Sequence, residues 1–74
     1  MKLTEVLKGH STIVTGIGED LSIRRKLMAF GIIPGSLTRV LQSNNKNLIL
    51  LSVMNRGVII EKTIAQNITV SHIK

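Results

Sequence analysis

The chain has 74 residues, a net charge of +6 and 43% hydrophobic residues, which is enough apolar material for one small folded domain over residues 1–74. Cysteine is absent, so disulfides, thiolate metal sites and cysteine nucleophiles are excluded. The longest aliphatic run, Leu48 to Leu51, is far shorter than the roughly 20 residues of a membrane-spanning helix. Polar residues interrupt the N-terminal segment, which argues against a signal peptide, and we expect a cytosolic protein.

The N-terminal segments predict a short turn followed by a strand. Residues 3–8 have a mixed pattern that suits one loose turn or a brief extended entry. Residues 11–17 are dominated by β-branched residues, which favour a strand. Alternation along this strand places Ile13, Thr15 and Ile17 together on one face.

Residues 20–30 carry the one helical pattern of the chain. Asp20 and Ser22 are both favourable N-cap residues. Gly31 follows directly and can adopt the left-handed conformation that commonly ends helices. Apolar residues recur at helical spacing and predict a stripe that faces the rest of the domain. This stripe consists of Ile23, Leu27 and Phe30.

Four further strands are expected after the helix. Pro34 and Gly35 fit the central positions of a type II turn that leads into the first of them. The strand over residues 48–54 is apolar almost throughout, so we expect both of its faces to be covered. Five short strands and one inserted helix around a small core predict a mainly β fold, a small barrel. The other expected elements are strands over residues 37–42, 58–61 and 68–73, a polar hairpin loop at residues 43–47, a tight connection at residues 55–57, and a single helical turn capped by Thr63.

The helix and the turn after it carry a resemblance to a known family. Residues 25–36, Arg-Lys-Leu-Met-Ala-Phe-Gly-Ile-Ile-Pro-Gly-Ser, resemble the R-x-L-x-x-L-G-x-x-P-G-[ST] signature of FeoA proteins, the small cytosolic partners of the bacterial ferrous iron transporter FeoB. Residues 13–17, 58–60 and 64–70 are also similar to that family. The resemblance implies an SH3-like barrel with the helix inserted after the first strand. In that fold Leu27 and Phe30 hold the helix on the barrel, Gly31 ends it, and Pro34 and Gly35 turn the chain back.

The resemblance also implies a function. It predicts an accessory protein of ferrous iron uptake that docks on a FeoB-type transporter, modulates it, and meets the membrane through that transporter alone. Two alternatives remain open at this point. One is a nucleic-acid or ribosome-associated SH3-like module, and the other is a metal-responsive regulatory domain.

The residues themselves argue against chemistry at an active site. They offer no nucleophile–base pair and no phosphate-binding glycine loop, so we expect no enzymatic activity and no cofactor. His10 and His72 lie near opposite ends of the chain, and the ends of a small barrel can approach each other. Two ligands are too few for a typical zinc or iron site, so we expect surface histidines and no metal site.

The positive charge invites a nucleic-acid interpretation that the aromatic content does not favour. Proteins that bind single strands need aromatic platforms, and Phe30 is the one aromatic residue among Phe, Tyr and Trp. We therefore expect no nucleic-acid partner. The basic residues cluster at one place only, Arg24, Arg25 and Lys26 on the predicted helix.

Two groups of residues are candidates for a protein-docking surface. The first group lies on the helix, outside its apolar stripe, and consists of Arg24, Arg25, Lys26 and Met28. These side chains project away from the barrel, so we expect them to border the partner. The alternative is that the basic residues form a solvated helix face. The chain also has more apolar residues than a small barrel can bury, and exposed apolar patches mark partner sites. Leu37, Leu41 and Met54 are the candidates for this second group. The alternative for Met28 and Met54 is that both side chains fill gaps in the core.

Overall fold

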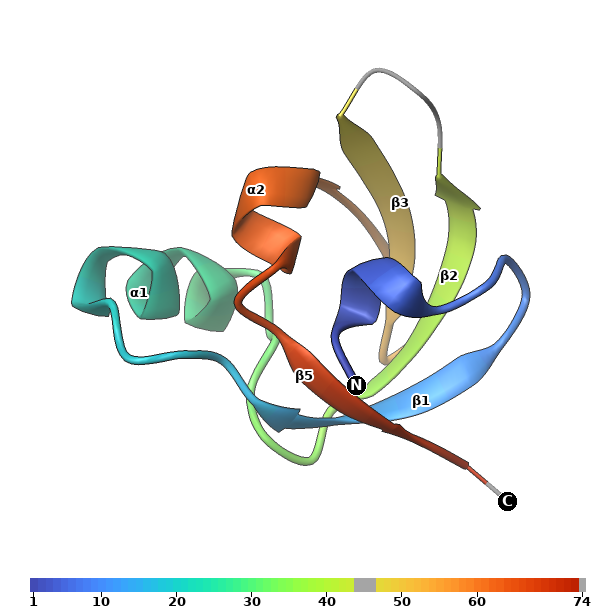
Figure 1. The fold of residues 1–74 in the computed structure, drawn as a ribbon, viewed down its shortest axis with the longest axis horizontal. Coiled ribbons are helices and arrows are strands. Elements are labelled where there is room, and N and C mark those ends of the chain that lie inside the picture. Colours follow the sequence, from blue (N-terminus) through green and yellow to red (C-terminus); the bar gives the residue numbers. More distant parts are fainter. Residues whose placement is uncertain (44–46, 74) are drawn as a thin grey trace.

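A computed structural model of the chain describes residues 1–43 and 47–73. Five antiparallel strands form one curled sheet in the order β4-β3-β2-β1-β5, and helix α1 lies to one side of it (Figure 1). Within the described residues, no helix is both long and apolar enough to cross a bilayer. The elements are η1 (Leu3–Glu5), β1 (Ser11–Gly16), α1 (Leu21–Ala29), β2 (Leu37–Ser43), β3 (Leu48–Val53), β4 (Arg56–Glu61), α2 (Lys62–Ala65) and β5 (Thr69–His72).

The predicted mainly β arrangement, with the longer helix between the first two strands, is confirmed. The short helix α2 packs against β3, β4 and η1. Every element contributes at least one side chain to a single core inside the curled sheet. The buried apolar residues are Leu3, Val6, Val14, Ile17, Leu27, Ile32, Val40, Ile49, Leu51, Val53, Ile60, Ala65, Ile68 and Val70.

Strand β1 turns a different face to the core from the one expected. Thr12 and Val14 are buried, whereas Ile13 is exposed. The pairing of β1 with β5 shifts register between Val14 and Gly16, and a β-bulge of this kind re-aims the residues after it. Ile17, beyond the shift, is buried. The prediction that Ile13 and Ile17 share a face is therefore wrong, because the bulge breaks the alternation between them.

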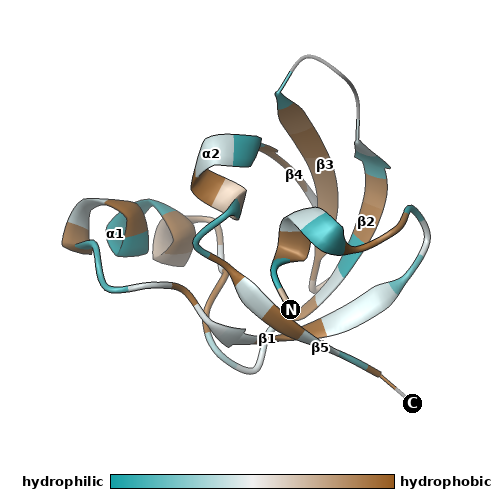
Figure 2. Cartoon of the chain, in the orientation of Figure 1, coloured by the Kyte–Doolittle hydropathy of each residue, from teal (hydrophilic) through white to brown (hydrophobic). Residues whose placement is uncertain are grey.

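Strand β3 is hydrophobic along most of its length (Figure 2). Ile49, Leu51 and Val53 face the core, but Leu48 is exposed and Leu50 is half-buried. The prediction that both faces are covered is wrong. Alternate residues point to the outer face of this antiparallel sheet, and within the described residues that face is at most partly covered, so the strand fully buries alternate residues only.

The hairpin between β3 and β4 is tighter than expected. Val53 pairs with Arg56, which leaves Met54 and Asn55 as a two-residue turn. Their φ values of 50° and 69° are both left-handed, as a type I′ hairpin turn requires. Strand β4 therefore begins at Arg56 and not at residue 58, and the connection predicted at residues 55–57 is wrong.

The other boundaries agree with the expected ones to within about two residues, which is the usual uncertainty of element ends. The helical turn near residue 63 is present, but Glu61 occupies its N-cap position and Thr63 lies inside α2. The middle of the hairpin loop predicted at residues 43–47 lies outside the described residues.

Helix α1 begins as its sequence predicts. The Asp20 carboxylate accepts hydrogen bonds from the backbone N–H groups of Ser22 (2.9 Å) and Ile23 (3.2 Å). These bonds satisfy two of the donors that a helix N-terminus leaves free. Ser22, the other candidate cap, lies inside the helix.

One residue of the predicted apolar stripe does not face the core. Leu27 is fully buried and Ile23 packs against the core, but Phe30 is 45% exposed. Phe30 is the C-cap residue, where the helix already ends. Its expected place is taken by Ile32, which the turn after the helix carries into the core. The prediction that Phe30 anchors the helix is therefore wrong.

The end of α1 is a Schellman motif. Gly31 has φ +81°, its N–H donates to the Met28 carbonyl (3.0 Å), and the Ile32 N–H donates to the Leu27 carbonyl (2.8 Å). This pair of bonds defines the motif, and the buried Leu27 and Ile32 are the apolar pair that usually accompanies it. The role predicted for Gly31 is confirmed.

The type II turn after the helix is also confirmed. The Ser36 N–H donates to the Ile33 carbonyl (2.9 Å), and Gly35 has φ +96°. The Ser36 hydroxyl donates in turn to the Gly31 carbonyl (2.9 Å), which ties this turn to the helix end. Together the helix end and the type II turn fix the path of the chain from α1 to β2.

A buried pair of hydroxyl groups joins β1 to β2. The Oγ1 atoms of Thr12 and Thr38 lie 2.9 Å apart, and both residues are almost completely buried. Replacing Thr38 with valine is expected to lower the free energy of unfolding by about 1–2 kcal/mol, because the Thr12 hydroxyl is left without this partner. Replacing both threonines with valine is expected to recover most of that loss.

Denaturant titrations of the two single variants and the double variant test this expectation as a double-mutant cycle. Two single losses that simply add in the double variant would show that the hydroxyl groups are not coupled.

Candidate functional site

The exposed side of α1 carries the first group of candidate docking residues. Arg24, Arg25, Lys26 and Met28 are all exposed, because Leu27 turns toward the core between them. Among the residues that the structure describes, none of these three cations has an ion-pair partner. Their predicted exposure is confirmed, and their role at a partner surface stays a prediction.

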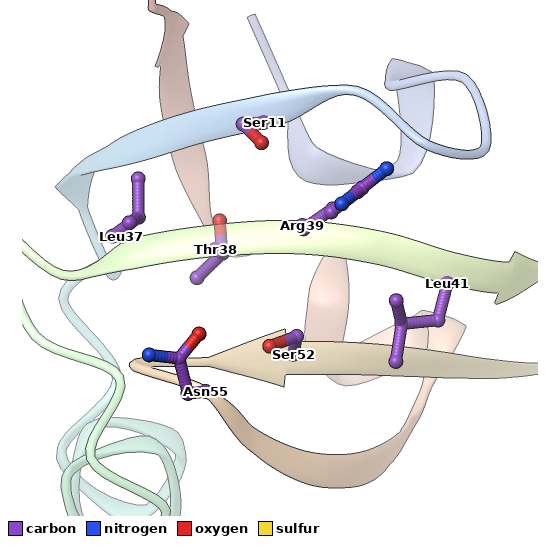
Figure 3. Close-up of a pocket in the computed structure, with 7 residues that line it drawn as sticks. All are labelled: Ser11, Leu37, Thr38, Arg39, Leu41, Ser52 and Asn55. Atoms are coloured by element: carbon purple, nitrogen blue, oxygen red, sulfur yellow. The ribbon is translucent and has the colours of Figure 1, made fainter.

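The second group lies around a shallow pocket on the outer face of the sheet. Leu37 and Leu41 line it from β2, with Arg39 between them (Figure 3). Its volume is about 250 Å³. Strand register places Arg39 opposite Ser11 of β1 and Ser52 of β3, so a polar row crosses three strands between the two leucines.

The position of Arg39 in this pocket is partly fixed. Its Nε–H donates a hydrogen bond to the Gly9 carbonyl at 3.1 Å. The other N–H groups of the guanidinium can still donate, because arginine carries five donors. The pocket therefore offers a cation between apolar walls, which suits a partner with both acidic and apolar groups.

Met54 lies beside this pocket, at the β3–β4 turn. Its backbone N–H donates to the Leu37 carbonyl (3.0 Å), so the two residues are neighbours. Leu37, Leu41 and Met54 are 44%, 37% and 61% exposed, which confirms that the surplus apolar residues reach the surface. The Met54 side chain opens onto a separate hollow beside Ile33 and Pro34.

Sequence reasoning missed a third surface, a groove between α1 and β4. Lys26 and Ala29 line it from α1, Phe30 from the C-cap of that helix, and Leu48, Ile59 and Glu61 from the sheet. Its volume is about 460 Å³, and Ile59 is 62% exposed. One signal pointed to it: Val58, Ile59 and Ile60 are consecutive, and a strand at the rim of a sheet cannot bury all three on one face.

The structure brings His10 and His72 together. Their ring centroids lie 5.9 Å apart in an edge-to-face arrangement. Across residues 1–43 and 47–73, no cluster of three or more histidine, aspartate or glutamate side chains could hold a metal ion. The expectation of surface histidines without a metal site stays a prediction.

A family model of the FeoA domain matches residues 1–72 of this chain. The chain belongs to the FeoA family. A crystal structure described as iron uptake regulatory protein (FeoA) is 30% identical to this FeoA-family chain, with a TM-score of 0.92 over 99% of this chain and 97% of the other. The solution structure of a FeoA protein from Chlorobium tepidum is 27% identical, with a TM-score of 0.90 over 100% of this chain and 71% of the other.

These matches confirm the predicted SH3-like fold of the FeoA-family chain. A manganese-dependent transcriptional repressor shares the fold alone, with 24% identity and a TM-score of 0.92 over 99% of this chain and 41% of the repressor. No protein of curated function matches the chain.

Proposed function

We propose that this FeoA-family protein is a non-enzymatic accessory protein of ferrous iron uptake that docks reversibly on the cytoplasmic portion of a FeoB-type transporter. The match of the FeoA family over residues 1–72 is the observation that carries the proposal. The similar crystal structure, described as an iron uptake regulatory protein, supports it. A cytoplasmic location, with contact to the membrane through the transporter, belongs to the same proposal.

The basic side of α1 is the surface that we assign to this docking. Arg24, Arg25 and Lys26 are exposed, have no ion-pair partner among the described residues, and stand beside the exposed Met28. Unpaired cations on a chain of net charge +6 attract an acidic partner and speed its encounter. They stabilise the fold little, because exposed charges typically contribute less than about 1 kcal/mol.

The docking surface is tested by reversing charge on α1. The Arg24→Glu, Arg25→Glu double variant is expected to keep the wild-type melting temperature, because these exposed side chains make no ion pair in the described structure. It is expected to bind the cytoplasmic portion of the transporter at least about tenfold more weakly, and added salt to weaken wild-type binding in the same direction. The measurements are a binding titration and a thermal melt.

Single variants supply a matched control. Arg25→Glu and Lys8→Glu change the net charge by the same amount, but Lys8 lies in the exposed turn between η1 and β1. We expect Arg25→Glu to weaken binding clearly more than Lys8→Glu. A folded double variant that binds like the wild type would move the interface to Leu37, Leu41 and Met54. A wild-type protein that binds at no salt concentration would overturn the docking itself.

A further inference from the structure

Strand β4 is an open edge of the sheet. It stands at the end of the strand order and, within the described residues, pairs only with β3. The pair that closes a two-residue hairpin is hydrogen-bonded, so Val53 and Arg56 set the alternation along β4. The Lys62 N–H donates to the Asn47 carbonyl (2.8 Å), which agrees with that alternation. Gly57 and Ile59 therefore direct their N–H and C=O groups away from β3.

The groove described above lies beside this edge. Ile59 of β4 forms one wall and Phe30, the C-cap residue of α1, contributes to the other, and their side chains are 62% and 45% exposed. In the part of the chain that the structure describes, the outward N–H and C=O groups of Ile59 have no strand partner, so the groove combines open strand-edge groups with apolar walls. An extended chain that pairs with β4 would place alternate side chains against those walls.

We propose that the edge of β4 binds an extended acidic segment of the partner, which adds to the sheet as a further strand in the groove between β4 and α1. This strand addition rests on the docking function proposed above and specifies how the partner binds. Main-chain hydrogen bonds to Gly57 and Ile59 supply affinity, and the contacts with Ile59 and Phe30 select apolar residues at alternate positions.

Charge distinguishes an acidic segment from a second copy of the chain as the occupant. Lys26 lines the groove, and Arg24 and Arg25 stand on the same helix without ion-pair partners in the described structure. The Glu61 carboxylate, which also lines the groove, lies within 3.5 Å of the Thr63 hydroxyl that donates to it. A second copy would bring another net charge of +6 to this basic surface, which opposes self-association.

Proline at position 59 tests strand addition at the backbone. The Ile59→Pro variant removes an N–H that the β3–β4 ladder does not use, and proline is tolerated at such edge positions. Binding of the transporter's cytoplasmic portion is expected to weaken at least about tenfold, the effect of losing one or two hydrogen bonds. Ile59→Val is the matched control, because it keeps the N–H and a branched apolar side chain, and its binding is expected to stay within about twofold.

A second variant covers the case in which Ile59→Pro does not fold. Ile59→Asp keeps the backbone donor and places a carboxylate beside the groove, where it repels an acidic segment. It is expected to weaken binding at least about tenfold, whereas Ile59→Thr, its uncharged polar control, is expected to weaken it less. Folded Pro or Asp variants that bind like their controls would overturn strand addition while leaving docking on the transporter intact.

A synthetic peptide tests the groove without the transporter. The probe is an eight-residue peptide of alternating valine and glutamate with blocked ends, compared with the same peptide carrying lysine in place of glutamate. We expect the glutamate peptide to shift the amide resonances of Gly57 and Ile59, and the lysine peptide to shift them much less.

Equal shifts with the two peptides would overturn the acidic character of the occupant. If neither peptide shifts the amide resonances of Gly57 and Ile59, strand addition is overturned. A protein that binds the glutamate peptide at β4 but does not bind the transporter portion supports the edge site and overturns the proposed function.

Discussion

Replacing Leu27 with alanine is expected to lower the free energy of unfolding by about 2–5 kcal/mol, the usual range for a buried leucine whose removal leaves a cavity. Leu27 is fully buried and is the main anchor of α1 in the core. A domain of this length has a total stability of about 4–11 kcal/mol at ordinary values per residue, so this one change removes a large share of it. Denaturant titration at 25 °C measures the loss.

The neighbouring residue provides the control for this experiment. Met28→Ala is expected to change the free energy of unfolding by less than about 0.5 kcal/mol, because the Met28 side chain is exposed and lies outside the core. If the two alanine variants lose similar stability, the packing of α1 through Leu27 would be disproved. If they differ as expected, α1 presents its basic side from a helix that the core holds in place.

Replacing Gly31 with valine is expected to lower the free energy of unfolding by about 2–3 kcal/mol, because a β-branched residue strongly disfavours a left-handed backbone. Gly31 has φ +81°. Apart from the two adjacent residues, a Cβ atom added there would meet no atom of the described structure within 4 Å, so crowding of the Cβ is not the cause of the loss. The loss therefore measures the backbone conformation of the Schellman motif.

Asparagine at the same position separates conformation from side-chain size. Gly31→Asn is expected to lose less than about 1 kcal/mol, because asparagine tolerates left-handed φ values well. Thermal and denaturant unfolding of both variants give the comparison. Equal losses for valine and asparagine would mean that positive φ at this position does not limit stability.

These two positions also separate stability from docking. Leu27 and Gly31 hold α1 and its end in place, whereas Arg24 and Arg25 on the same helix are exposed and without ion-pair partners in the described structure. Variants of the first kind are expected to lower the melting temperature, and variants of the second kind to lower affinity alone. A binding loss without a change in melting temperature therefore reports on the interface itself.

The helix and the turns after it could be predicted from the sequence alone. Asp20 caps α1, Gly31 ends it, and Pro34 with Gly35 reverses the chain, and the structure contains each of these features. The physical reason is that caps and tight turns depend on residues within a few positions of one another. The motif that carries the family resemblance lies in this segment, which is why the family could also be predicted.

The faces and edges of the sheet were decided by tertiary structure. Phe30 is exposed and Ile32 is buried because the chain turns into the core only after the helix has ended. Ile17 is buried although Ile13 is exposed, because β1 bulges between them where it pairs with β5, a strand more than fifty residues away in the sequence. The burial of Ile17 is not encoded in the residues next to it, since it depends on which distant strands pair and where their register shifts.

The candidate site also has a part that the sequence predicts and a part that only the tertiary structure decides. The exposed cations of α1 follow from helical periodicity, so the sequence by itself determined that a basic surface exists. The groove that Lys26 and Phe30 share with Ile59 brings together residues about thirty positions apart. Only the tertiary structure decided that β4 is the open edge of the sheet and that this edge lies beside the basic helix, because strand order is fixed by pairing across the whole chain and not by any local pattern.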